Sequence, residues 1–208
     1  MSRRRRSFLP RTVLHVCNRG AMQMKLFTES EDYALCENTL VSSMEDYPVR
    51  LYAYCIMPNH WHLLLDGDNQ LYLSRFIQHF TSSHARCYRR NEHTVGCGAV
   101  YQNRFRAYAV QRNEAFVRVA HYIEVNPVKA GLCTNASDWR WSSAHPGVSN
   151  NIPLTPWPME KPYDWAQILT QETRGDWTDR INISLKFGKP LGDIEWSRFC
   201  KKPKGRTN

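Results

Sequence analysis

The sequence predicts an α+β protein: an antiparallel β-sheet flanked by helices, followed by a C-terminal extension. Strand-like and helix-like segments alternate over residues 13–144 without a low-complexity linker, so this stretch has the pattern of a single domain. Two of the strand-like runs are adjacent in sequence, as in a β-hairpin. Beyond residue 145 five prolines fall within 17 positions. We therefore expect a basic arm over 1–12, a domain over 13–145, and a Pro- and Trp-rich extension with a basic tail over 146–208.

The first half of the domain has four local signals. Residues 13–17 form a short strand candidate, and Ser30 begins a helix with acidic residues in its first turn. Residues 49–57 are rich in aromatic and branched side chains, which favours a strand. The turn signal at Pro58 leads into a second extended run over 60–65. These two runs are the predicted hairpin.

The second half continues the alternation. Residues 71–90 place apolar side chains at helical spacing among arginines, which predicts a basic amphipathic helix, and residues 104–111 alternate like a strand. Asn113 then caps a helix that should stop near Asn126, because Pro127 disfavours helical geometry in the residue before it. The order strand, helix, strand, strand, helix, strand, helix favours an antiparallel sheet covered by helices.

Composition excludes several classes of protein. With 42% hydrophobic and 23% charged residues, the 208-residue chain is not collagen-like, mainly disordered or a coiled coil. The seven cysteines are odd in number and include no C-x-x-C pair, so neither a disulfide framework nor a Cys-based zinc site is expected. The basic N-terminus lacks the apolar stretch of a signal peptide, and no run of 18 apolar residues predicts a membrane span. We expect a cytoplasmic protein.

Positive charge is concentrated in three stretches, residues 1–20, 71–112 and 196–208. They carry 18 basic and 1 acidic side chains, so they sum to +17 while the rest of the chain sums to −8. Such a basic face suggests a polyanionic partner, since Lys and Arg replace the counterions that condense on phosphates. The alternative is a solvated surface with an unstructured Arg-rich leader.

Two histidines form a candidate metal site. In a strand, alternate side chains share a face, so His60 and His62 should point the same way, with Trp61 on the other face. Two neutral imidazoles suit a divalent ion but leave its coordination incomplete, so a further ligand must come from elsewhere. The alternative is a pair of histidines satisfied within the protein, without a metal.

The helix that begins at Asn113 carries a second candidate pair. At about 100° per residue, Tyr122 and Asn126 lie on the same flank of this helix, beside its apolar face. A phenol next to an amide oxygen would bring a nucleophile and a neutral metal ligand to one place. The alternative for Tyr122 is a boundary aromatic whose hydroxyl lies in water.

These two motifs match a known family. The run Met57-Pro58-Asn59-His60-Trp61-His62, followed by Tyr122-Ile123-Glu124-Val125-Asn126-Pro127-Val128-Lys129-Ala130-Gly131-Leu132, strongly resembles the REP-associated tyrosine transposases, where REP denotes a repetitive extragenic palindrome. These belong to the single-tyrosine branch of the HUH nucleases, with an IS200-like transposase domain. The resemblance covers roughly residues 7–145 and implies a ferredoxin- or RRM-like HUH nuclease fold.

The resemblance also implies a mechanism. His60, His62 and Asn126 would hold one Mg²⁺ or Mn²⁺ ion, and Tyr122 would be the nucleophile. The enzyme would cleave and rejoin single-stranded, hairpin-forming repetitive palindromic DNA through a covalent 5′-phosphotyrosine, without a nucleotide cofactor. We expect a monomer or homodimer, associated with the bacterial nucleoid and not with a membrane. Two alternatives remain: a non-catalytic DNA- or RNA-binding regulator derived from a transposase, and a metal-dependent hydrolase without a covalent step.

Other side chains are candidates for contacts with the nucleic acid. Tyr101, Phe105 and Tyr108 are candidates for stacking on unpaired bases. We expect the extension to be a non-compact arm anchored by tryptophans. The predicted phosphate-binding residues are Arg3, Arg4, Arg5, Arg6, Arg19, Arg75, Arg86, Arg89, Arg90, Arg104 and Arg106.

Overall fold

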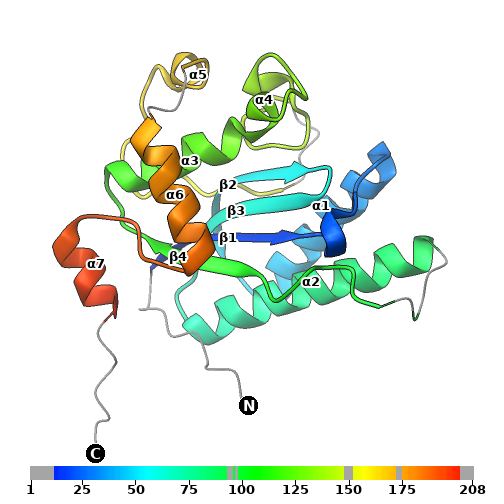
Figure 1. The fold of residues 1–208 in the computed structure, drawn as a ribbon. Helices are drawn as coiled ribbons and strands as arrows, with labels where there is room; N and C mark the ends of the chain where they lie inside the picture. Colours follow the sequence, from blue (N-terminus) through cyan, green and yellow to red (C-terminus); the bar gives the residue numbers. More distant parts are fainter. Residues whose placement is uncertain (1–11, 93–95, 97, 148–151, 172–174, 202–208) are drawn as a thin grey trace, which may run out of the picture.

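The computed structural model describes residues 12–92, 96, 98–147, 152–171 and 175–201 (Figure 1). Its centre is a four-stranded sheet with the strand order β2-β3-β1-β4, in which every pair of neighbours is antiparallel. Helices cover the sheet on both faces, so the predicted α+β class is confirmed. The arginine-rich arm lies almost wholly outside the described residues.

The strands follow the predicted order. β2 and β3 form the expected hairpin, and Pro58 and Asn59 make its turn. β3 then pairs with β1, where Cys17 lies opposite His62 and Arg19 lies opposite His60. The bounds are β1 (Val13–Arg19), β2 (Arg50–Met57), β3 (His60–Asp66) and β4 (Arg106–Val110).

The alternation of β3 divides the core into two layers. Trp61, with its odd-numbered neighbours on the strand, packs into a cluster with the helices α1 (Ser30–Asp46) and α2 (Gln70–Asn91). Leu64 belongs to the cluster on the opposite face, which α3 (Glu114–Glu124) covers. Because His60 and His62 share the parity of Leu64, strand geometry turns both toward the helix that carries the candidate tyrosine.

The C-terminal extension is helical where a non-compact arm was expected, and that prediction was wrong. Four of its prolines fall within residues 153–162 and none within α6, where Trp177, Ile181 and Leu185 follow at helical spacing and pack into the α3-side cluster. Figure 1 shows α6 beside α3 on the same side of the sheet. The helices are α5 (Trp165–Ile168), α6 (Gly175–Phe187) and α7 (Ile194–Lys201).

Tryptophans anchor the extension, as expected. Trp165 is buried, and its indole nitrogen donates to the Glu124 carboxylate at the end of α3 over 2.8 Å. Trp157 stacks edge-on against Trp165 and against Phe116 of α3. The extension is therefore fastened to the helix that bears Tyr122.

The helix that begins after Asn113 ends close to the predicted position. α3 stops at Glu124, and the single turn α4 (Asn126–Lys129) follows with Pro127 near its start. In the first turn of a helix the backbone N–H has no intrahelical partner, so a proline, which has no N–H, is tolerated there. Two short 3₁₀ turns complete the elements, Ala21–Gln23 and Ala136–Asp138. Among the described residues, no helix is long and apolar enough to span a membrane.

Candidate active site

The four residues predicted to carry the chemistry lie around one cavity of about 410 Å³. β3 supplies His60 and His62, and the α3–α4 junction supplies Tyr122 and Asn126. The two imidazole centroids are 5.0 Å apart, and the His62 centroid is 5.9 Å from that of the Tyr122 ring. Two motifs about 60 positions apart in the sequence are thus in contact in the fold.

His60 is held in a form that suits a metal ligand. Its Nδ1 atom lies 2.6 Å from the side-chain oxygen of Asn59, and since an amide oxygen only accepts, Nδ1 carries the proton. Nε2 therefore keeps its lone pair. Burial, together with the positive charge of Arg19, lowers the pKa of His60 to about 4, so the ring is neutral at pH 7.

His62 is the end of a buried chain of hydrogen bonds. Its Nδ1 lies 2.8 Å from Nε2 of His15, and Nδ1 of His15 lies 2.8 Å from the hydroxyl of Tyr108. Burial lowers the pKa of His62 well below its usual range and that of His15 to about 3, so both rings are neutral. When His62 donates from Nδ1 to His15, and His15 donates in turn to Tyr108, Nε2 of His62 keeps its lone pair.

Sequence reasoning missed the part that His15 and Tyr108 play here. The side chain of Tyr108 is completely buried, so the prediction that it stacks on bases was wrong. Its partner lies on β1, and the contact exists because β1 pairs with β4 on one side and β3 on the other. No local sequence signal gives that register.

Asn126 completes a donor set that fits a divalent cation. Its Nδ2 atom donates to the backbone carbonyl of Tyr122 over 2.6 Å, so Oδ1 is the atom left for a ligand. Among the described residues no cluster of three His, Cys, Asp or Glu side chains is found. An amide oxygen is a ligand that suits Mn²⁺ or Mg²⁺, and neutral imidazole nitrogens are ligands for divalent transition metals.

The phenol of Tyr122 is touched by the C-terminal extension. Its hydroxyl donates to Oδ1 of Asn182 on α6 over 3.2 Å, and Nζ of Lys129 lies 5.1 Å from the ring centroid. Burial raises the pKa of Tyr122 to about 12; Cys17 adds to this effect and Arg19 opposes it. The phenol is therefore protonated at pH 7, and Asn182 is a neighbour that the sequence did not predict.

Comparison with known proteins decides the family. The sequence model of the family described as "Transposase IS200 like" matches residues 10–126, more than half of the chain. The chain belongs to this family. A REP-associated tyrosine transposase of Escherichia coli (strain K12) is 25% identical over 147 residues, which cover 69% of this chain and 79% of that protein. A protein from Haemophilus influenzae is 28% identical over 140 residues, covering 64% and 75%.

The fold has a solved counterpart. A structure described as a REP-associated tyrosine transposase bound to a REP hairpin superposes with a TM-score of 0.56 at 21% identity, covering 77% of this chain and 92% of that one. The similarity confirms the predicted arrangement of sheet and helices. The resemblance drawn from the histidine and tyrosine motifs is confirmed by the family match.

In this member of the IS200-like family, the predicted phosphate-binding arginines fall into separate groups. Arg19, Arg104 and Arg106 line the cavity with the histidines. Arg86, Arg89 and Arg90 line a second cavity along α2, which Arg104 also reaches, and Arg75 is exposed on α2 outside the lining of both. The four N-terminal candidates, Arg3, Arg4, Arg5 and Arg6, lie outside the described residues.

Proposed function

We propose that the chain is a metal-dependent single-stranded DNA transesterase that cleaves and rejoins hairpin-forming repetitive palindromic DNA through a covalent 5′-phosphotyrosine. Membership of the IS200-like transposase family supports a transposase-like function on DNA. One observation carries the finer proposal: a tyrosine, two neutral histidines and three arginines line the same cavity.

Each group has a distinct task. Arg19, Arg104 and Arg106 offset the charge of the scissile phosphate as it approaches Tyr122. A divalent ion held by the two histidines and Asn126 would supply Lewis-acid polarisation of that phosphate. The side chains around the cavity keep the phenol close to the phosphorus, which converts the attack into an intramolecular step.

The covalent step exchanges one phosphate ester for another. The Tyr122 oxygen forms a bond to phosphorus, the bond from phosphorus to the 3′ oxygen of the preceding nucleotide breaks, and that oxygen leaves as a 3′-hydroxyl after taking up a proton. With a pKa of about 12, the phenol must give up its own proton during attack. Because the ester bond is conserved, a second 3′-hydroxyl reverses the step and joins new ends without a nucleoside triphosphate.

The DNA partner is inferred from the relatives. The solved counterpart is described as bound to a REP hairpin, and this chain shares its fold. We therefore propose a hairpin with an unpaired flank as the substrate class.

Substituting Tyr122 tests the proposal. We expect wild-type protein, incubated with Mn²⁺ and a labelled repetitive-palindrome hairpin carrying a single-stranded flank, to give an SDS-resistant protein–DNA adduct. Tyr122→Phe should give no adduct, while its DNA affinity changes by less than about threefold, because the ring stays and only one hydroxyl is lost. Tyr163→Phe is the matched control, since that tyrosine is fully exposed and does not line the cavity.

Two results would contradict the proposal. Cleavage that persists in Tyr122→Phe would favour a hydrolase that activates water. Tight binding by the wild type without any adduct or cleavage would favour a regulator.

A further inference from the structure

A second cavity of about 1050 Å³ runs along α2. One wall is the exposed face of α2, and the other is the segment of residues 99–105 that leads into β4. We name it the α2 groove. Its walls include Asn18, Asn103 and Arg104, and these same residues line the cavity that contains Tyr122. The two cavities therefore share a wall, and the groove begins where the candidate active site ends.

The groove has the chemistry of a surface for unpaired nucleotides. Its described lining contains four arginines and no acidic side chain, so it complements phosphate. The lining also includes the partly exposed Ala85 and the largely buried Val100 and Phe105, and Arg104 lies 5.7 Å from the centroid of the Phe105 ring. Hydroxyl and amide groups such as those of Thr81 and Gln78 can both donate to and accept from base edges.

The groove is built on rigid parts of the molecule. Tyr101 lines it, and the Tyr101 hydroxyl accepts a hydrogen bond from the indole of Trp61 over 3.0 Å and lies 2.9 Å from Nδ1 of His84. All three side chains are buried. Across the groove, Arg89 on α2 donates to the carbonyl oxygen of Gly98 over 3.2 Å. A preformed surface of this kind costs little ordering when it binds a ligand.

We propose that the α2 groove binds the unpaired nucleotides adjoining the scissile phosphate, with phosphates on Arg86, Arg90 and Arg104 and bases against the apolar wall. The inference rests on the proposed function, because it makes the groove an extension of the same substrate site. A duplex would hide its base faces by stacking and reach only the arginines. Single strands expose those faces, which is why a groove that alternates cationic and apolar surface selects them.

Binding to two probes tests the groove separately from catalysis. The first is a DNA hairpin with a thymidine flank of about ten nucleotides, within the usual site size for single strands, and the second is the same hairpin without a flank. We expect Ser82→Trp, which fills the groove from an exposed α2 position, to weaken binding of the flanked probe at least about tenfold, the scale of one lost base-stacking contact. Binding of the flankless probe should not change.

A charge variant provides an independent test. Arg86→Ala should weaken the flanked probe and lower the slope of log affinity against log salt by about one, as expected for one lost phosphate contact. Arg118→Ala removes the same charge from α3, where Arg118 pairs with Glu114, and serves as the control. Leu71→Trp, at an exposed α2 position outside the groove lining, controls for the added indole.

A crosslink reports location directly. Cys87 lines the groove as a partly exposed thiol. A flank carrying a disulfide-activated base should couple to the wild type and at least about tenfold less to Cys87→Ser. Coupling that survives this substitution, or Ser82→Trp and Arg86→Ala proteins that bind the flanked probe like the wild type, would overturn the proposal. An RNA flank bound much more tightly than DNA would overturn the choice of ligand.

Failure of the groove and failure of the proposed function are distinguishable. If the wild type forms the Tyr122 adduct and the groove variants bind the flank normally, only the groove assignment falls. If flank binding depends on the groove but no adduct forms, the groove stands and the transesterase proposal falls.

Discussion

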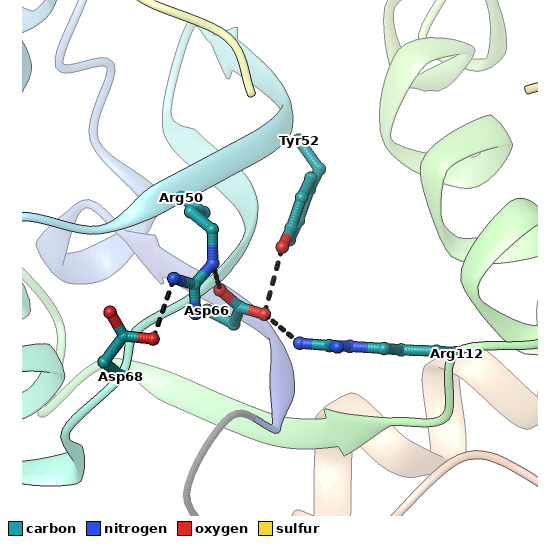
Figure 2. A network of polar contacts seen from close by, with 5 residues as sticks. All are labelled: Arg50, Tyr52, Asp66, Asp68 and Arg112. Carbon is teal, nitrogen blue, oxygen red and sulfur yellow. Dashed lines mark hydrogen bonds and ion pairs between the residues drawn. The ribbon is translucent and has the colours of Figure 1, made fainter. Parts of the chain in front are cut away.

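The two ends of β3 carry polar side chains that differ in how completely the protein supplies their hydrogen-bond partners. At its last residue, the carboxylate of Asp66 has no exposed surface and is enclosed by partners from the start of β2 and from the segment that follows β4 (Figure 2). Arg50 donates to Oδ1 over 2.6 Å, and Tyr52, over 3.0 Å, and Arg112 donate to Oδ2. Arg50 also reaches Asp68 over 2.8 Å, which extends the network to the surface.

At the first residues of β3 the polar side chains have fewer hydrogen-bond partners within the protein than Asp66 has. His60 and His62 each have one ring nitrogen bonded within the protein, to Asn59 and His15, while both residues also line the cavity with Tyr122. Both rings are kept neutral by burial, so neither end of the strand leaves a buried charge uncompensated. The carboxylate of Asp66 has every partner supplied by the protein, which is typical of a structural group, whereas a ring bonded on a single side keeps a nitrogen for the proposed metal ion.

The largest expected effect comes from removing the two arginines that neutralise the buried carboxylate of Asp66. In Arg50→Met with Arg112→Met, the buried carboxylate loses both cations, and we expect the free energy of unfolding to fall by about 3–5 kcal/mol. Urea denaturation followed by circular dichroism measures it. Asp68→Asn is the control, because that side chain is 72% exposed and such a pair contributes about 1 kcal/mol or less. A double variant as stable as this control would show that the Asp66 network is not a structural requirement.

Acid should lower the free energy of unfolding through His15, at the histidine end of β3. In the folded state the pKa of His15 is about 3, against about 6.5 in the unfolded chain, so the unfolded state binds more protons between these values. Stability is therefore lost as pH falls below about 6.5. At pH 4.5 the loss from this one ring is roughly 3 kcal/mol, since each pH unit corresponds to about 1.36 kcal/mol. His15→Gln should show a shallower decline in denaturation experiments at pH 7 and pH 4.5, and an unchanged decline would contradict the assignment.

Metal affinity should depend on the hydrogen-bond chain behind His62. His15→Phe removes the partner of Nδ1, and we expect Mn²⁺ to bind about 10–100-fold more weakly by calorimetry, as is typical when an orienting partner of a ligand is lost. His15→Gln retains an acceptor and should recover part of the affinity. Tyr52→Phe, at the Asp66 end, should leave it unchanged. Equal Mn²⁺ affinities in the wild type and His15→Phe would show that His15 does not support metal binding.

The sequence predicted the parts of the site that depend on local geometry. Strand alternation places both histidines on one face, and helical spacing places Asn126 beside Tyr122. Contacts that depend on pairing register were not predictable, because His15 meets His62 only through the pairing of β1 with β3. The Asp66 network needs the ends of three strands to converge, which no single segment specifies.

The extension shows the same limit at longer range. Its tryptophan anchors were predicted from composition, but its helices were not, since the proline-rich run dominated the local signal. Asn182 reaches Tyr122 across 60 positions of sequence, by way of the packing of α6 on α3.

The smallest expected effect concerns this contact between α6 and the proposed nucleophile. The Tyr122–Asn182 hydrogen bond is exposed and joins neutral groups, so it contributes about 0.5–1.5 kcal/mol at most. In the proposed mechanism the phenol leaves Asn182 before it attacks phosphorus, so Asn182→Ala should raise the rate of adduct formation by up to about tenfold, the rate equivalent of about 1.4 kcal/mol. DNA affinity and the melting temperature should stay close to wild type. Ile183→Ala, at an exposed α6 position, controls for changes in the helix itself. A slower rate in Asn182→Ala would mean that this amide orients the phenol for attack, and would place α6 with the histidine end of β3 as part of the reacting site.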